Sequence, residues 1–186
     1  MNRRLALALI ACALPLGGCF QPQLYNGPLD DEPATPYRLA SGDRLRIIVF
    51  GQNDLSNLYA VDGSGRISMP LIGEVAVAGY TTLEAERTIA ARLRKGFIRE
   101  PKVTVDVDTY RPFFVLGEVN SSGQYPYVNG MSAQTAVAIA GGFTPRADRT
   151  YAELTRRTPE GLVTANVPII YPVKPGDTIV IRERWF

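Results

Sequence analysis

The stretch YRLASGDRLRIIVF, residues 37–50, contains the pattern that decides the fold. Its apolar Leu45, Ile47 and Val49 occupy every second position, as expected of a β-strand with one buried face. The sequence Ser-Gly-Asp at 41–43 precedes this strand. In a tight turn, glycine adopts a φ that other residues avoid, and aspartate accepts hydrogen bonds from nearby backbone N–H groups. The stretch therefore predicts a half-buried strand that begins at a turn.

A similar stretch, YPVKPGDTIVI, occupies residues 171–181. Both stretches begin with tyrosine, carry an apolar residue two positions later, and continue through Gly-Asp into a β-branched strand. Asp43 and Asp177 can be interpreted either as a pair of catalytic carboxylates or as two turn residues. The turn interpretation is favoured, because Gly-Asp before a strand is what a tight turn requires.

Residues 37–110 are predicted to form one domain, a small β-sheet with a single helix. Within residues 59–69, a Gly-rich turn between two short strand patterns indicates a hairpin. Thr81 and Glu84 have capping-box spacing, and the apolar positions that follow predict a helix over about 82–95. Valines that alternate with polar residues at 103–107 predict a further strand.

A second domain is predicted over residues 111–186. Its predicted strands are 113–119, 124–128, 151–157, 162–167 and 178–184. Small side chains at helical spacing predict a short helix over 132–140, which a Gly-Gly pair ends. One helix on a mixed sheet of about five strands fits a β-grasp arrangement. The chain as a whole is accordingly predicted to be an α+β protein.

The N-terminal segment has the features of a secretion signal, predicted to span residues 1–18. Arg3 and Arg4 precede an apolar run that is too short to cross a bilayer, which takes about 20 apolar residues. The sequence Leu-Gly-Gly-Cys at 16–19 resembles the lipobox of bacterial lipoproteins. This resemblance implies cleavage before Cys19 and acylation of its thiol and amino group. The alternative is an ordinary signal peptide that leaves a free thiol.

Acylation at Cys19 is predicted to anchor the mature chain in a membrane. Residue 20 is Phe and not Asp, which in Gram-negative lipoproteins favours the outer membrane, with the protein facing the periplasm. Residues 19–36 are rich in Pro, Asp and Asn without periodic apolar positions, so they are predicted to be a flexible tether. Once the signal is removed, basic and acidic residues balance. A nucleic-acid-binding surface is therefore not expected.

Two groups of motifs resemble known families. The sequences Asp-Gly at 62–63, Pro-Leu-Ile-Gly-Glu-Val at 70–75 and Ala-Gly-Tyr-Thr at 78–81 are similar to the polysaccharide biosynthesis/export domain. Val-Leu-Gly-Glu-Val at 115–119 and Ala-Ile-Ala-Gly-Gly-Phe at 138–143 are similar to the soluble-ligand-binding β-grasp (SLBB) module. Taken in this order, the motifs resemble outer-membrane polysaccharide export lipoproteins of the Wza type.

The resemblance implies a subunit of a homo-oligomeric ring through which capsular or exopolysaccharide leaves the periplasm. It also implies an inner-membrane polysaccharide co-polymerase as a partner. Full-length family members carry a further β-grasp module and a C-terminal amphipathic helix that forms the outer-membrane pore. This sequence ends at Phe186, directly after its last predicted strand. We therefore expect a short form whose ring lies beneath the outer membrane and works with a separate β-barrel pore.

Aromatic and basic side chains of the second domain are the candidate ligand-binding residues. Tyr125 and Tyr127 offer flat faces to sugar rings, and Arg156 and Arg157 suit an acidic polymer. Tyr110, Tyr151, Trp185, Arg146 and Arg149 share these properties. For the tyrosines the alternative is packing within the sheet. For the arginines it is a solvated or intersubunit face.

A polysaccharide-cleaving enzyme is the alternative function from another class. Glycoside hydrolysis needs two carboxyl groups at a defined separation, and the acids of this chain lie mostly in turns or beside glycine. The chain has no histidine, and its only mature thiol is the one predicted to be acylated. No catalytic residue, metal site or cofactor is therefore expected. A third alternative is a structural adaptor lipoprotein of the envelope, whose loss should leave polymer secretion intact.

Overall fold

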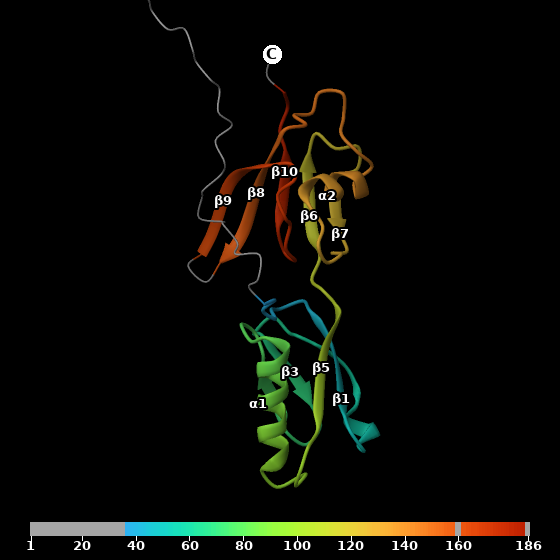
Figure 1. Ribbon diagram of the computed structural model, residues 1–186, viewed down its shortest axis with the longest axis vertical. Helices are drawn as coiled ribbons and strands as arrows, with labels where there is room; N and C mark the ends of the chain where they lie inside the picture. Colours follow the sequence, from blue (N-terminus) through green and yellow to red (C-terminus); the bar gives the residue numbers. More distant parts are fainter. Residues whose placement is uncertain (1–35, 159–160, 185–186) are drawn as a thin grey trace, which may run out of the picture.

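Two hydrophobic cores, stacked along the long axis, organise the protein in the computed structural model (Figure 1). The structure describes residues 36–158 and 161–184. The first domain contains strands β1 to β5 and helix α1, and the second contains strands β6 to β10 and helix α2. The α+β fold class predicted from the sequence is confirmed. Within the described residues, neither helix has the length and apolar character needed to cross a membrane.

The first domain is built on a three-stranded antiparallel sheet in the order β2-β1-β5. Its strands are β1 (Arg44–Val49), β2 (Asn57–Ala60) and β5 (Val103–Thr109), with the short 3-10 helix η1 (Asn53–Leu55) between β1 and β2. Strands β3 (Arg66–Met69) and β4 (Gly73–Ala76) form a separate two-stranded sheet. The hairpin predicted at the Gly-rich turn is wrong, because β2 and β3 flank that turn but pair with β1 and β4 instead of with each other. Every second side chain of β1 is buried, which confirms the strand predicted from its alternating pattern.

Helix α1 (Thr82–Arg94) covers this core and begins at the predicted capping box (Figure 1). The Thr81 hydroxyl accepts a hydrogen bond from the Glu84 N–H at 3.2 Å, and the Glu84 carboxylate accepts one from the Thr81 N–H at 2.7 Å. These bonds satisfy N–H groups that no helical carbonyl reaches. Ile89 and Leu93 on the inner face have no exposed surface. The helix thus closes the first core as its sequence predicted.

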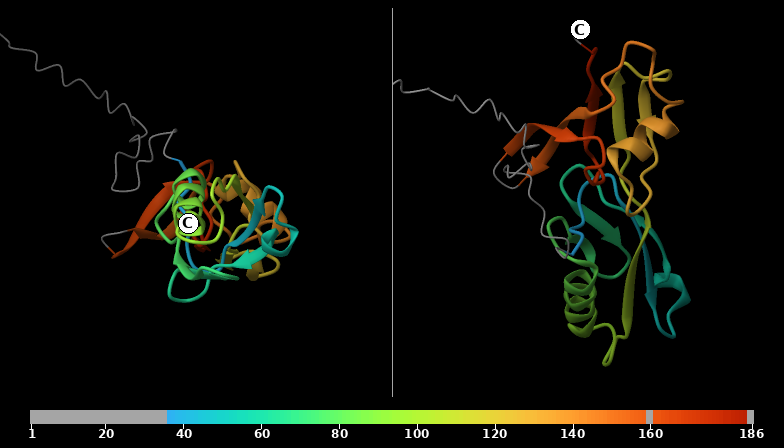
Figure 2. Two further views of the ribbon diagram at one scale, coloured as in Figure 1. Left: turned by 90° about the horizontal axis from the view of Figure 1, so that it is seen from below. Right: turned by 45° about the horizontal axis from the view of Figure 1, so that its top comes forward.

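The second domain has a five-stranded mixed sheet in the order β7-β6-β10-β8-β9, in which β6 and β10 pair in parallel. Its strands are β6 (Phe113–Gly117), β7 (Gly123–Tyr125), β8 (Tyr151–Thr158), β9 (Gly161–Pro168) and β10 (Thr178–Ile181). Helix α2 (Ala133–Ile139) packs on one face of the sheet through small buried side chains. We call the opposite face the uncovered face. The β8–β9 hairpin extends sideways, away from α2 (Figure 2).

Strand β6 ends two residues earlier than the sequence predicted, at Gly117. This glycine has a φ of 84°. A Cβ atom added to it would lie 2.1 Å from the Ile181 carbonyl oxygen, so no other residue fits there. Ile181 is also the last residue of β10, which the sequence extended to residue 184. The close approach of the two backbones therefore coincides with the end of both strands.

The two Gly-Asp sequences form matching turns, as predicted. Asp43 accepts a hydrogen bond from the Ala40 N–H at 2.8 Å, and Asp177 accepts one from the Lys174 N–H at 2.7 Å. In each case the donor lies three residues before the aspartate. The exposed fractions of Asp43 and Asp177 are 0% and 1%. Both carboxylates are therefore buried parts of their turns.

The chain between the domains packs against both turns. The Arg111 N–H donates to Asp43 Oδ1 at 2.9 Å, and its Nη1 donates to the Tyr37 hydroxyl at 2.8 Å. A Cβ atom at Gly176 would lie 2.6 Å from Arg111 Nε, so the second turn leaves no room for a side chain beside the arginine. The Tyr110 ring meets the Tyr37 ring edge-on at 4.9 Å. The domain junction is therefore a packed contact.

Candidate functional site

Arg156 and Arg157 are adjacent on β8 and point to opposite faces of the sheet. Arg156 is 6% exposed, and its Nε and Nη2 donate to the Asp177 carboxylate at 3.0 and 2.7 Å. Its Nη2 also donates to the Pro172 carbonyl at 3.1 Å. Arg157 is exposed on the uncovered face. The structure thus gives Arg156 a partner inside the fold, whereas Arg157 faces solvent.

Tyr125 and Tyr127 lie on the side of the sheet that faces the core. The Tyr125 ring packs 6.0 Å from the Phe113 ring, and its hydroxyl donates to a backbone carbonyl at 2.5 Å. The Tyr127 ring meets Tyr110 edge-on at 5.5 Å, and burial raises the pKa of Tyr127. The sheet separates these rings from Arg157, so the predicted ligand-binding residues do not share one surface. Their contact with polysaccharide stays a prediction.

Two further predicted sites fall outside the part of the chain that the structure describes. Cys19, the predicted lipidation site, precedes it, and Trp185 follows it. Their roles in membrane attachment and sugar stacking therefore stay predictions. Among residues 36–158 and 161–184, no three potential metal-ligating side chains gather in one place.

A cleft of about 490 Å³ lies at one end of the second domain's sheet. It is formed by residues 147–151, which lead into β8, by Asn166 on β9, and by residues 182–184, which follow β10. Backbone hydrogen bonds join the first and last of these segments. The Asp148 N–H donates to the Arg182 carbonyl at 2.8 Å, for example. The sequence did not predict this cleft, because its walls come from three segments that are far apart in the chain.

Ion pairs line the rim of this cleft. Arg182 pairs with Glu153, and Arg146 pairs with Glu183. The hydrogen bonding of the Arg146 guanidinium to the Glu183 carboxylate is the main reason why the pKa of Arg146 is raised. Arg149 differs from these two arginines, because its guanidinium lies over an aromatic ring. The cleft is therefore rich in guanidinium groups, and only some of them are paired with carboxylates.

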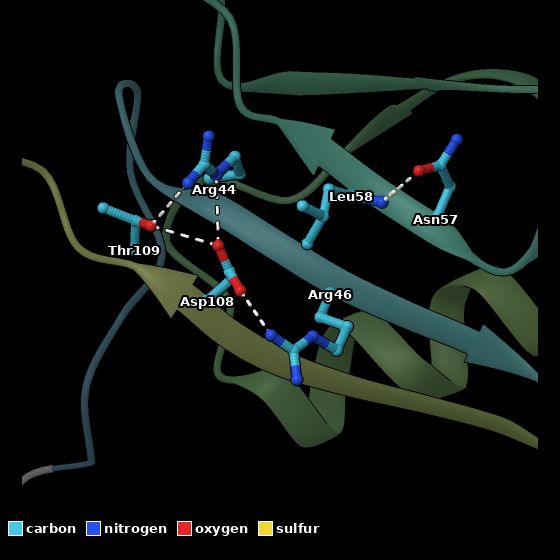
Figure 3. A network of polar contacts seen from close by, with 6 residues as sticks. All are labelled: Arg44, Arg46, Asn57, Leu58, Asp108 and Thr109. Carbon is cyan, nitrogen blue, oxygen red and sulfur yellow. Dashed lines mark hydrogen bonds and ion pairs between the residues drawn. The ribbon is translucent and has the colours of Figure 1, made fainter.

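The outer face of the first domain's sheet carries a polar network at one end (Figure 3). Asp108 on β5 accepts hydrogen bonds from Arg44 Nε at 3.1 Å and from Arg46 Nη2 at 2.6 Å. The Thr109 hydroxyl links Arg44 to Asp108. The bond from Arg46 is the largest cause of the lowered pKa of Asp108. Because both arginines are more than half exposed, we expect the network to stabilise the fold only weakly.

The other end of this face is apolar. Phe50 is 79% exposed and Ile48 is 47% exposed, and Leu58 on β2 lies on the same face (Figure 3). The Lys102 ammonium group lies 5.9 Å from the centroid of the Phe50 ring. Contiguous exposed apolar side chains of this kind often mark protein contacts.

The sequence matches two family models, one for each domain. The model of the polysaccharide biosynthesis/export protein matches residues 31–108, and the SLBB domain model matches residues 112–167. The chain belongs to the polysaccharide biosynthesis/export protein family. Its first domain is the export domain and its second is the SLBB domain.

Relatives of this chain are found among curated proteins of three bacteria. It is 33% identical over 127 residues to the exopolysaccharide production protein ExoF of Rhizobium meliloti. The aligned region covers 62% of this chain and 30% of ExoF. It is 31% identical over 189 residues to the EPS I polysaccharide export outer membrane protein EpsA of Ralstonia nicotianae, covering 81% of this chain and 48% of EpsA. The polysialic acid transport protein KpsD of Escherichia coli is 27% identical over 133 residues, covering 68% of this chain and 24% of KpsD. The chain thus spans half or less of the length of these relatives.

Proposed function

We propose that this protein is a lipid-anchored subunit of an oligomeric complex that exports capsular or exopolysaccharide from the periplasm across the outer membrane. The observation that carries the proposal is the presence, in one chain, of an export domain followed by an SLBB domain. The names of the relatives add support, because they describe exopolysaccharide production, polysaccharide export and polysialic acid transport. An inner-membrane co-polymerase is the proposed partner that delivers the polymer.

Acylation of Cys19 is the proposed attachment to the outer membrane. The Leu-Gly-Gly-Cys sequence at 16–19, placed at the end of a secretion signal, supports it. Each buried CH₂ group contributes about 0.8 kcal/mol, so two or more acyl chains together hold a protein stably. A tether over residues 19–36 then lets the folded domains extend into the periplasm.

A ring of identical subunits is the proposed assembly. Contacts between two different surfaces of the same chain close into a ring when the rotation between neighbours allows it. The apolar patch at Ile48 and Phe50 is one such surface. Strand β9 is another, because it lies at the edge of its sheet and pairs on one side only within the described residues.

The proposed role is transport and not catalysis. The names of the family and of the relatives describe export, production and transport. Asp43 and Asp177, which the sequence offers as a carboxylate pair, are buried in turns of different domains. Each carboxylate is already bonded to protein groups.

Deletion of the gene, followed by complementation, tests the proposal. We expect the deletion strain to stop releasing polymer, and the unaltered gene to restore release. Cys19→Ser should restore much less polymer and should release the protein from the membrane fraction. Cys12→Ser is the matched control, because it removes the other cysteine and leaves the lipobox intact. Normal polymer release by the deletion strain would contradict the proposal and favour a structural adaptor.

A further inference from the structure

The cleft in the SLBB domain has the size of a small-ligand site. Its volume of about 490 Å³ lies within the range of roughly 300–1,000 Å³ that such sites occupy. Tyr151 and Asn166 line it from β8 and β9, and Arg149 and Arg182 line it from the segments beside the strands. The cleft therefore combines neutral and cationic groups around one space.

The acidic side chains of the cleft are already engaged. Asp148 Oδ1 accepts hydrogen bonds from the N–H groups of Thr150 and Tyr151 at 2.8 and 3.4 Å. Glu183 accepts a hydrogen bond from Arg146 Nε at 2.7 Å. Because both carboxylates bind protein donors, they are poorly placed to attract a cationic ligand.

Two basic side chains of the cleft, Arg149 and Arg182, have unused donors. A guanidinium group carries five N–H donors. Arg149 has no carboxylate partner among the described residues, and its guanidinium lies 5.9 Å from the centroid of the Phe143 ring. Arg182 pairs with Glu153, yet its side chain is 68% exposed. Two guanidinium groups with open N–H bonds favour a carboxylate, which a guanidinium can bind through two parallel hydrogen bonds.

The neutral groups of the cleft suit a sugar ring. Tyr151 is 38% exposed and offers an apolar ring with a polar hydroxyl. The Asn166 amide both donates and accepts hydrogen bonds, as sugar hydroxyls require. In the register of β8 and β9, Asn166 lies opposite Glu153. Glu153 is two residues from Tyr151 on the same strand, so the side chains of Asn166 and Tyr151 belong to the uncovered face. A polymer lying along this face can therefore reach the cleft.

We propose that this cleft binds a carboxylate-bearing sugar residue of the exported polymer. Arg149 and Arg182 bind the carboxylate, while Tyr151 and Asn166 contact the sugar ring. This assignment rests on the proposed export function, since it names the class of polymer carried as an acidic polysaccharide. Binding at one sugar residue is expected to be weak, because a transported chain must leave the site again.

Calorimetric titration of the whole chain, purified in detergent micelles, tests the proposal. Three probes are used. Trigalacturonate is a trisaccharide that carries carboxylates, maltotriose is a neutral trisaccharide, and acetate is a carboxylate without a sugar. The test variant combines Arg149→Ala with Arg182→Ala. The matched control combines Arg94→Ala with Arg99→Ala, which removes two exposed positive charges from the export domain. Thermal unfolding of each variant verifies that it is folded before titration.

We expect trigalacturonate to bind the unaltered chain at least about tenfold more tightly than maltotriose does, since charge-assisted hydrogen bonds to guanidinium contribute the difference. Its Kd should rise about tenfold or more in the test variant and stay unchanged in the control variant. Equal binding of the two trisaccharides, or equal losses in the two variants, would overturn the proposal. So would the absence of trigalacturonate binding, or full competition by acetate at the same concentration.

The complementation assay separates this proposal from the export function on which it rests. If deletion stops polymer release but the protein does not bind trigalacturonate, the acidic-sugar site is rejected and the export function stands. If the protein binds trigalacturonate through Arg149 and Arg182 but deletion leaves polymer release unchanged, the site stands and the export function is rejected.

Discussion

The two Gly-Asp turns have the same local geometry, but their aspartates bind different partners. In each turn the carboxylate accepts a hydrogen bond from the backbone N–H three residues earlier. Asp43 then binds Tyr37 and Arg111 at the domain junction. Asp177 binds Arg156, which lies within its own sheet. Local sequence therefore sets the turn, whereas the distant partner of the aspartate decides whether the turn joins two domains or stabilises one.

The largest effect is expected from removal of the buried arginine. Arg156→Met leaves the Asp177 carboxylate buried without its guanidinium partner, which costs about 3–5 kcal/mol of the free energy of unfolding. Arg157→Met is the matched control on the exposed side of the same strand, with an expected change within about 0.5 kcal/mol. Urea unfolding measures both values. Equal effects of the two substitutions would mean that the buried ion pair contributes no more to the free energy of unfolding than an exposed arginine does.

A smaller effect is expected at the equivalent partner in the first turn. Arg111→Ala should lower the free energy of unfolding by about 1–2 kcal/mol, because Asp43 keeps the Tyr37 hydroxyl and two backbone N–H donors. Small-angle X-ray scattering should also report a wider range of domain orientations. Arg99→Ala serves as the control for loss of one charge. An unchanged scattering profile would show that Arg111 does not hold the junction.

Tyr37 makes the stability of the first turn depend on pH. Burial is the largest cause, and the hydrogen bond to Asp43 the second, of a pKa of Tyr37 that is raised above the ordinary value for tyrosine. The contribution of the protonated Tyr37 hydroxyl to the free energy of unfolding is therefore fully present below the unfolded-state pKa of about 10. It is lost as the pH rises above that value. Tyr37→Phe should cost about 1 kcal/mol at neutral pH. The difference from the unaltered protein should shrink above about pH 10 in unfolding measurements; a constant difference would contradict the assignment.

The smallest effect is expected on the exposed face of the export domain. Asp108→Asn removes ion pairs with Arg44 and Arg46, whose side chains are largely exposed. Exposed pairs contribute little, so the free energy of unfolding at neutral pH should stay close to that of the unaltered protein. Because the pKa of Asp108 is lowered, its contribution is present above the unfolded-state pKa and is lost as the pH falls. A large loss at neutral pH would show that the network is structural.

The sequence predicted the features that depend on neighbouring residues. Alternation identified β1, the spacing of Thr81 and Glu84 identified the start of α1, and the Gly-Asp pairs identified both turns. Each of these rests on contacts between residues a few positions apart. The end of β6 was missed, because it depends on the approach of Gly117 to Ile181 in a distant strand.

The sequence predicted less about the candidate site. The sequence offers Arg156 as a candidate ligand-binding residue and does not predict its burial beside Asp177. A usable signal was present, since Ala152 and Leu154 place Arg156 on the buried side of an alternating strand. A cation at such a position requires an internal partner. The cleft had no comparable signal, because Arg149 and Arg182 become neighbours only through the folded sheet.

The position of Tyr37 has a mechanical consequence for the proposed anchored protein. Its hydroxyl bonds to Asp43 beside Arg111, in the segment that joins β5 of the first domain to β6 of the second. Tension from the acylated cysteine would therefore enter at the middle of the molecule, where the two domains meet. A pulling force would strain this hydroxyl–carboxylate contact first, while the far ends of both domains would carry no load and stay free to meet neighbouring subunits.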